Sequence, residues 1–395
     1  SKYREKASIN PNEQDITYDG QYINDIASEL FEKYQDLLFE KTNHNKIIKD
    51  CAISHILNLI KQDLNKVNIK HDIFFSEASL LANDEISKTM EYLKEKKYIY
   101  WGKLPLPKNQ EDIDLEQREQ DIFASTMFGD DIDRAVSKED GSHTYFASDI
   151  AYHQNKISRG FSKLVNIWGA DHAGYVKRLK NALKAINKKE IHLNIKLTAL
   201  VNLLKDNIKM KMSKRAGNYI TMRDVLDEVG VDAIRFVMIS RNADKKIDFD
   251  LDIFLQKNKD NPVFYIQYAH ARCSSIINIA KEKFKELNIE KKKNISLKNL
   301  ELNEEKLIIK QVCSFYNIIE SSAKNYEPHR ISNYLYDLAK TFHNYWSLGN
   351  IDESKRILIE ENIDLSRSRI FLILAVKSVI KKGLDILKIT CPEKM

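Results

Sequence analysis

With 395 residues, of which 43% are hydrophobic, the chain can form two or three domains, and it has no apolar run of about 18 residues that could span a membrane. The four cysteines are far apart and form no Cys-x-x-Cys pair, which predicts no zinc site and a reducing, cytoplasmic location. The formal net charge of +6 is compatible with a nucleic-acid partner, but lysine is abundant throughout the chain, so the charge alone is weak evidence.

The first third of the sequence is mostly helical in its apolar spacing. Apolar residues recur three or four positions apart, for example at Ile23, Ile26 and Leu30. The patterns predict helices over 22–39, 46–67 and 79–97, and short strands over 72–75 and 98–102. We therefore predict an inserted, mainly helical segment over about 25–125 between parts of a larger fold.

Strands and helices alternate over residues 126–220. Leu164–Trp168 is a short apolar strand, Tyr175–Ala185 is an amphipathic helix, and Ile191–Leu204 begins as a strand. Such alternation predicts a parallel, doubly wound α/β sheet, whose ligands bind at the carboxyl ends of the strands. The pair Asp171-His172 follows the first strand directly and is therefore predicted to lie in a site.

A cationic loop follows the second of these strands. It reads Lys211-Met212-Ser213-Lys214-Arg215, and Gly217 comes shortly after it. Lysine ammonium groups act as mobile point charges on phosphoryl oxygens, and they are most effective where negative charge develops in a transition state. The loop is therefore predicted to bind a polyphosphate, although a short basic run taken alone is more often a solvated surface.

From about residue 221 the apolar spacing is helical to the end of the sequence. We predict connecting helices over 221–256, with a break at Gly230, and a bundle of roughly five helices over 257–395. The five helices are expected near 261–287, 302–325, 328–347, 353–362 and 365–388. The predicted fold class is thus α/β plus all-α.

Several stretches match the motifs of one family in the same order. They are Gly129–Arg134, Thr144–His153, Gly169–His172, Lys211–Arg215, Asp232–Arg235, Asn261–Arg272 and Gly383–Met395. Together they resemble the arginyl-tRNA synthetases of the bacterial type, which are class I aminoacyl-tRNA synthetases. The resemblance implies the later half of a Rossmann-like catalytic domain over 1–256 and a helical anticodon-binding domain over 257–395. The HxGH motif of class I enzymes is missing, so we expect a chain without the N-terminal domain and the HxGH-bearing half, inactive alone.

The resemblance implies an arginine–tRNA ligase, which activates L-arginine with ATP and transfers it to the terminal adenosine of tRNA(Arg). Mg²⁺ is expected with the ATP, and no metal site of the protein's own is expected. The implied arginine-binding residues are Tyr145, Asp149 and Asp171. The implied ATP-binding residues are His172, Lys211, Met212 and Lys214, and the implied catalytic residues are Lys211, Ser213, Lys214 and Arg215. Without the resemblance, Asp149 would be interpreted as a helix cap and Tyr145 as a core aromatic residue, and His153 is open between a substrate contact and a structural role.

In the helical part, the resemblance implies tRNA contacts at Tyr268, Arg272, Tyr345 and Trp346. Unstacked RNA bases stack on aromatic rings and guanidinium planes, which these residue types provide. The alternative is that each of these aromatic residues belongs to a helical core. We expect a monomer, and the alternative functions are a tRNA-binding module without catalysis and another class I synthetase.

Overall fold

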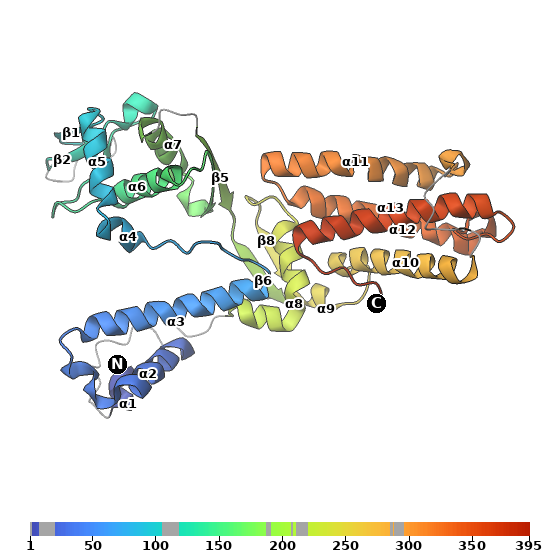
Figure 1. Cartoon of the computed structure of the whole chain (residues 1–395), viewed down its shortest axis with the longest axis horizontal. Coiled ribbons are helices and arrows are strands. Elements are labelled where there is room, and N and C mark those ends of the chain that lie inside the picture. The colour runs from blue at the N-terminus through green and yellow to red at the C-terminus, as the bar shows by residue number, and fades with distance from the viewer. Residues whose placement is uncertain are drawn as a thin grey trace. The chain divides into compact units, whose positions relative to one another are not determined.

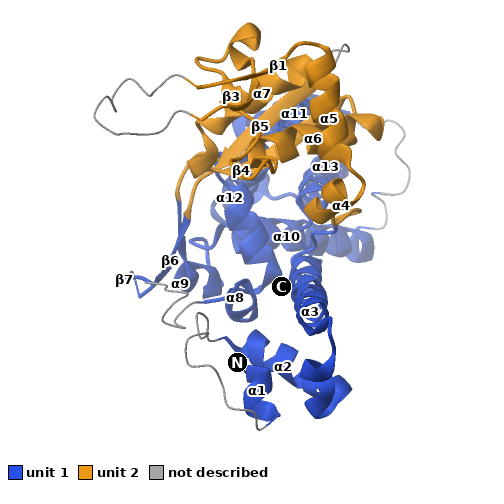
Figure 2. Cartoon of the chain, turned by 90° about the vertical axis from the view of Figure 1, so that its left-hand side faces the viewer, with its two compact units in different colours: residues 1–70, 201–242, 247–395 blue, residues 71–200, 243–246 orange. Residues whose placement is uncertain are grey.

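The computed structural model describes residues 2–7, 20–104, 118–186, 191–206, 208–210, 220–284, 287 and 296–395. The chain divides into two compact units: unit 1 contains residues 1–70, 201–242 and 247–395, and unit 2 contains residues 71–200 and 243–246 (Figure 2). Each unit buries hydrophobic clusters of its own. The predicted domain boundary near residue 256 lies within unit 1 and stays a prediction.

Unit 2 begins with two short helices, α4 (Glu77–Ala82) and α5 (Glu85–Glu95). They are separated at Asp84, whose φ of 57° is in the left-handed region and cannot continue a right-handed helix. The helix predicted over 79–97 is therefore divided in two. Leu80 and Leu93 from these helices are buried in the core of unit 2.

A small antiparallel sheet follows in unit 2. Its strands pair in the order β1 (Ile99–Gly102), β2 (Gln120–Phe123) and β3 (Arg134–Ala135). The strand predicted over 98–102 is confirmed by β1. The strand predicted over 72–75 is wrong, because these residues have no regular structure.

The second sheet of unit 2 is a parallel pair, β4 (Lys163–Gly169) and β5 (His192–Thr198). Helix α7 (Tyr175–Ile186) lies between the two strands in sequence, as the crossover of a parallel pair requires. Helix α6 (Tyr145–Ser158) precedes β4 and contacts α7. The predicted α/β alternation is confirmed for this part of the chain.

Unit 1 contains a three-stranded sheet with β6 at its centre. The strands are β6 (Val201–Lys205), β7 (Ile208–Lys209), which is antiparallel to β6, and β8 (Ile247–Asp250), which is parallel to it. Helix α8 (Met222–Ile239) connects this region and is interrupted at Gly230, whose φ of 81° favours glycine. The predicted break at Gly230 is confirmed. A short helix, α9 (Leu251–Leu255), follows β8.

The first helices of unit 1 form a small cluster of their own. They are α1 (Lys2–Lys6), α2 (Gln21–Tyr34), the 3₁₀ helix η2 (Gln35–Glu40) and α3 (His44–Lys66). Their shared core includes Tyr3, Leu30 and Leu38. An ion pair between Asp63 of α3 and Arg223 of α8, with 2.6 Å between the nearest atoms, joins this cluster to the rest of unit 1.

Long helices make up the C-terminal part of unit 1, where they lie side by side (Figure 1). In the described residues there are four of them: α10 (Pro262–Lys283), α11 (Asn303–Asn325), α12 (His329–Ile351) and α13 (Ile363–Leu387). The fifth helix predicted over 353–362 is wrong, since this segment holds only the 3₁₀ helix η7 (Glu353–Lys355). Within the described part of the chain, no helix is long and apolar enough to cross a membrane.

Candidate functional site

Helix α6 presents Tyr145 and Asp149 to a cavity of about 300 Å³ in unit 2. Its N-cap is Thr144, whose side chain accepts a hydrogen bond from the amide of Ala147, so Asp149 is not the cap. Asp149 follows Tyr145 by four positions, which places both on one helix face. The cavity is lined by Phe75, Glu77, Leu80, Tyr145, Ser148, Asp149 and Tyr152. The side chain of Tyr145 is 78% exposed, so it is not a core aromatic residue.

The lining combines flat aromatic surfaces with carboxylates. The rings of Phe75 and Tyr152 are stacked with 4.6 Å between their centroids. Glu77 and Asp149 contribute the carboxylates. A planar cation suits such a site, because a guanidinium can stack on aromatic rings while it donates hydrogen bonds to carboxylate oxygens.

Tyr175, the first residue of α7, holds the Asp149 carboxylate from outside the cavity. Its hydroxyl donates a hydrogen bond to Oδ2 of Asp149 over 2.7 Å. Burial, followed by the charge of Asp149, raises the pKa of Tyr175 well above its ordinary value, so the phenol stays a neutral donor. The sequence does not predict this role of Tyr175, because nothing in a single sequence pairs the start of one helix with a residue on another.

Trp168 links this pair to the end of β4. Its ring centroid lies 5.7 Å from that of Tyr175 and 6.0 Å from that of His172. His172 and Asp171 belong to the 3₁₀ helix η4 (Ala170–His172) at the carboxyl end of the strand, as predicted, and both are exposed. A side chain at Gly169 would place its Cβ 2.4 Å from Oδ1 of Asp171, so the Asp171 side chain would have to turn away.

His153 has a structural role. Its side chain is 2% exposed, and Nδ1 lies 2.7 Å from the main-chain oxygen of Asp149. Nε2 lies 2.9 Å from Nδ2 of Asn166, while Oδ1 of Asn166 accepts from Lys156, so the network assigns the proton to Nδ1. Burial lowers the pKa of His153, which keeps the ring neutral. The contact joins α6 to β4.

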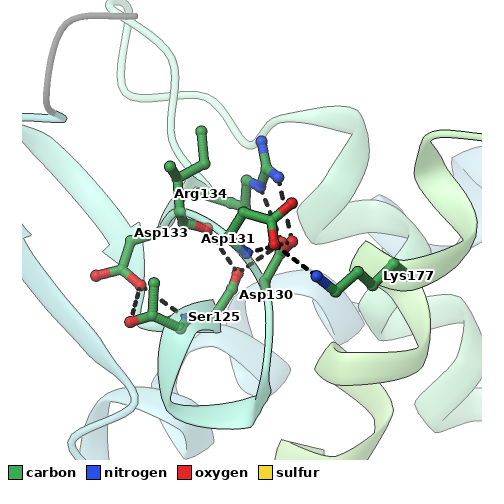
Figure 3. Close-up of polar contacts among 8 residues, drawn as sticks. Ser125, Asp130, Asp131, Asp133, Arg134 and Lys177 are labelled. Atoms are coloured by element: carbon green, nitrogen blue, oxygen red, sulfur yellow. Dashed lines mark hydrogen bonds and ion pairs between the residues drawn. The ribbon is translucent and has the colours of Figure 1, made fainter. Parts of the chain in front are cut away.

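The loop Gly129–Arg134 fixes the small sheet to α7 (Figure 3). The carboxylate of Asp130, 2% exposed, pairs with Arg134 at 3.0 Å and accepts from Ser125 at 3.2 Å. Burial alone would raise the pKa of Asp130, but hydrogen bonds and the Arg134 charge together hold it below its ordinary value. Asp131 pairs with Lys177 of α7 at 2.5 Å. The loop thereby supports the helix that carries Tyr175.

A second cluster of predicted residues lies in unit 1, on α10 and α12. The Arg272 guanidinium carbon is 4.5 Å from the ring centroid of Tyr268 and 5.3 Å from that of Trp346. The three side chains are partly exposed. Tyr345 is different: it is 0% exposed, and its hydroxyl donates to Glu305 over 2.9 Å. Because the ring of Tyr345 is enclosed in the core, Tyr345 is left out of the proposed tRNA-binding cluster.

The cationic residues Lys211, Lys214 and Arg215, together with Met212 and Ser213, lie outside the described residues. Their predicted phosphate-binding and catalytic roles stay predictions. Among the residues that the structure describes, no group of three or more His, Cys, Asp or Glu side chains could hold a metal ion.

Comparison with known proteins shows the family to which the chain belongs. A crystal structure from Campylobacter jejuni, described as an arginyl-tRNA synthetase, is 32% identical with a TM-score of 0.81, and the match covers 99% of this chain and 79% of that one. The chain belongs to the arginyl-tRNA synthetase family. Two family models match parts of it: tRNA synthetases class I (I, L, M and V) over residues 139–252, and the DALR anticodon binding domain over residues 266–395.

Curated arginyl-tRNA synthetases are longer than this chain. The arginine–tRNA ligases of Ehrlichia chaffeensis and Pelagibacter ubique are 43% and 41% identical to it, over 96% and 98% of its length. The chain spans only 65% and 66% of those proteins. The arginyl-tRNA synthetase of Thermus thermophilus, 16% identical with a TM-score of 0.69, is similar in fold.

The Asp232–Arg235 element has structural contacts. Asp232 accepts hydrogen bonds from the main-chain nitrogen of Thr390 over 2.9 Å and from the Thr390 hydroxyl. It also accepts one from Nε2 of Gln267 over 2.8 Å. The element therefore holds the segment around Thr390 against α10.

Proposed function

We propose that the chain takes part in an arginine–tRNA ligase, which activates L-arginine with ATP and transfers it to tRNA(Arg). The observation that carries the proposal is the cavity that brings Tyr145 and Asp149 together on one face of α6. Family membership supports the same reaction. Because the chain spans about two thirds of its curated relatives, the activity of the whole protein is part of the proposal.

In this proposal, the cavity in unit 2 selects arginine. The Asp149 carboxylate accepts N–H groups of the substrate guanidinium, and Glu77 contributes a second negative charge. The exposed ring of Tyr145 provides a flat surface for the guanidinium plane. A pocket of this kind favours arginine over amino acids whose side chains are neutral.

In this proposal, the cationic loop binds the phosphates of ATP. Lys211, Lys214 and Arg215 neutralise phosphate charge in the proposal. The predicted ATP-binding role of His172 and the predicted arginine-binding role of Asp171 are separate assignments at the end of β4. Adenylate formation needs mainly positioning and charge stabilisation, since the arginine carboxylate itself attacks the α-phosphorus. Mg²⁺ enters with ATP as part of the substrate.

In this proposal, the cluster of Tyr268, Arg272 and Trp346 binds tRNA. Anticodon-loop bases can stack on its aromatic and guanidinium planes, and the positive charge of Arg272 attracts phosphates. The match to an anticodon-binding domain over 266–395 supports this assignment.

The test is arginine-dependent ATP–pyrophosphate exchange in the presence of tRNA(Arg), measured with this chain and with any longer form of the protein. Ligand-observed NMR with L-arginine measures binding by this chain independently of turnover. We expect arginine to bind, and we expect exchange, where it occurs, to depend on arginine. Exchange that depends on another amino acid, or the lack of arginine binding, contradicts the proposal.

A second candidate is a tRNA-binding module without an activation step. It is favoured by one observation: the Arg272 cluster lies wholly in unit 1 and needs no residue of unit 2. Retained tRNA(Arg) binding together with undetectable arginine binding would select this candidate over the ligase.

A further inference from the structure

We propose that Tyr175 is a positioning residue that fixes the plane of the Asp149 carboxylate and thereby makes the cavity prefer a guanidinium over an ammonium. The inference rests on the proposed arginine pocket and adds a determinant of its specificity. Tyr175 does not line the cavity, so it acts through Asp149.

The hydrogen bond occupies one oxygen of the carboxylate and leaves the other open. The Tyr175 hydroxyl donates to Oδ2 over 2.7 Å. Within the described part of the chain, the Asp149 side chain accepts no other hydrogen bond. Oδ1 therefore keeps its acceptor positions for a ligand. Since an ionised carboxylate has about four acceptor positions, Oδ2 can also accept a second donor.

Packing holds the Tyr175 ring in place without help from a ligand. Its centroid lies 6.0 Å from that of Phe146 and 5.7 Å from that of Trp168. The guanidinium carbon of Arg178 lies 5.4 Å from the same ring. The hydroxyl is therefore a fixed donor, and the orientation of the carboxylate follows from the scaffold.

A fixed carboxylate plane distinguishes two cations of equal charge. A guanidinium is a planar fork whose paired N–H groups need a carboxylate in a matching plane. An ammonium is a compact point charge with rotatable donors, so it tolerates a carboxylate that turns freely. Loss of the Tyr175 hydroxyl should therefore weaken arginine binding more than lysine binding.

The experiment compares the full chain with its Tyr175→Phe variant, which loses only the hydroxyl and keeps the ring contacts. Ligand-observed NMR titrations with L-arginine and L-lysine give the ratio of the two dissociation constants. We expect Tyr175→Phe to weaken arginine binding roughly tenfold, the effect of losing one hydrogen bond to a charged group, and to reduce the arginine-over-lysine ratio severalfold.

The matched control is Tyr100→Phe in the same unit. It also removes a tyrosine-to-aspartate hydrogen bond, from Tyr100 to Oδ2 of Asp133 over 2.9 Å, but away from the cavity. We expect it to leave both dissociation constants unchanged. Partial unfolding of a variant would lower the apparent affinity for both ligands by the same factor, so the ratio stays diagnostic.

Two results would overturn the inference and are distinguishable. If the unaltered chain prefers arginine and Tyr175→Phe keeps the same ratio, Tyr175 does not position Asp149 and only this inference fails. If the unaltered chain shows no preference for arginine, the proposed arginine pocket fails and the inference fails with it.

Discussion

Arg235 donates a hydrogen bond from Nε to the main-chain oxygen of Leu387 over 2.8 Å, although the two are 152 positions apart in sequence. From Nη1 it donates a second hydrogen bond to the main-chain oxygen of Val67 over 2.6 Å. One side chain on α8 thus satisfies carbonyl groups at the ends of α3 and α13, where helices leave acceptors without partners. Arg235 and Asp232 together tie three distant parts of unit 1.

Replacing Arg235 with alanine should destabilise unit 1 by about 2 kcal/mol, because two hydrogen bonds from a charged donor are lost. Urea unfolding followed by circular dichroism measures the change in the free energy of unfolding. The control is Arg241→Ala, since Arg241 is exposed. Equal midpoints for the two variants would contradict the structural role of Arg235.

The buried ion pair of Glu305 and Arg369 should respond strongly to the loss of one partner. The two side chains are 0% and 4% exposed, and their nearest atoms are 2.7 Å apart. Arg369→Met should cost about 3–5 kcal/mol, because it leaves the Glu305 charge buried without compensation. The double variant with Glu305→Gln should be less destabilised than Arg369→Met alone, and a strictly additive result in urea unfolding would contradict this account.

The stability of unit 1 should fall as the pH is lowered through the titration range of His343. Burial lowers the pKa of His343 to about 4, from 6.5 in the unfolded chain. The hydrogen bond to the Tyr265 carbonyl opposes this decrease, and the charge of Arg272 adds a smaller decrease. The folded state therefore binds fewer protons than the unfolded state between these values. The stability contribution is complete above pH 6.5 and is lost as the pH falls towards about 4.

The size of this effect is up to about 3 kcal/mol, at about 1.4 kcal/mol for each pKa unit. Urea unfolding at several pH values in that window measures it. His343→Gln should flatten the dependence. An unchanged slope in His343→Gln would show that other groups control it.

Trp346→Ala should weaken the binding of tRNA(Arg) by about 1–3 kcal/mol if one base stacks on this ring. Tyr316→Ala is the control, because Tyr316 is a 72% exposed aromatic residue on α11, outside the Arg272 cluster. Filter binding at one fixed salt concentration gives the two affinities. Equal losses, or no loss, in both variants would remove Trp346 from the tRNA contact.

Helical periodicity was sufficient to place Tyr145 and Asp149 on one face, because the four-residue spacing holds in any regular helix. It could not choose between Tyr345 and Trp346. Neighbouring helical residues point about 100° apart, so one of the two can face the core while the other faces solvent. Which of the two faces the core depends on the neighbouring helix, where Glu305 accepts a hydrogen bond from the Tyr345 hydroxyl.

The segment 353–362 shows a different limit of sequence reasoning. Its apolar spacing resembles that of a helix, but side chains distant in sequence form hydrogen bonds with its main-chain groups. Arg369 donates to the main-chain oxygens of Ser354 and Arg356, and Ser366 bonds to the main chain of Ile359. These partners come from α13, so no local pattern reveals them.

Asp149 is proposed to bind the arginine guanidinium, and an NMR titration of L-arginine into Asp149→Asn tests this contact. The control is Asp133→Asn, which also alters a carboxylate that accepts from a tyrosine in unit 2. We expect Asp149→Asn to weaken arginine binding roughly a hundredfold, because a close charge pair is lost, and Asp133→Asn to leave it unchanged. Unaltered arginine affinity in Asp149→Asn would contradict the claim.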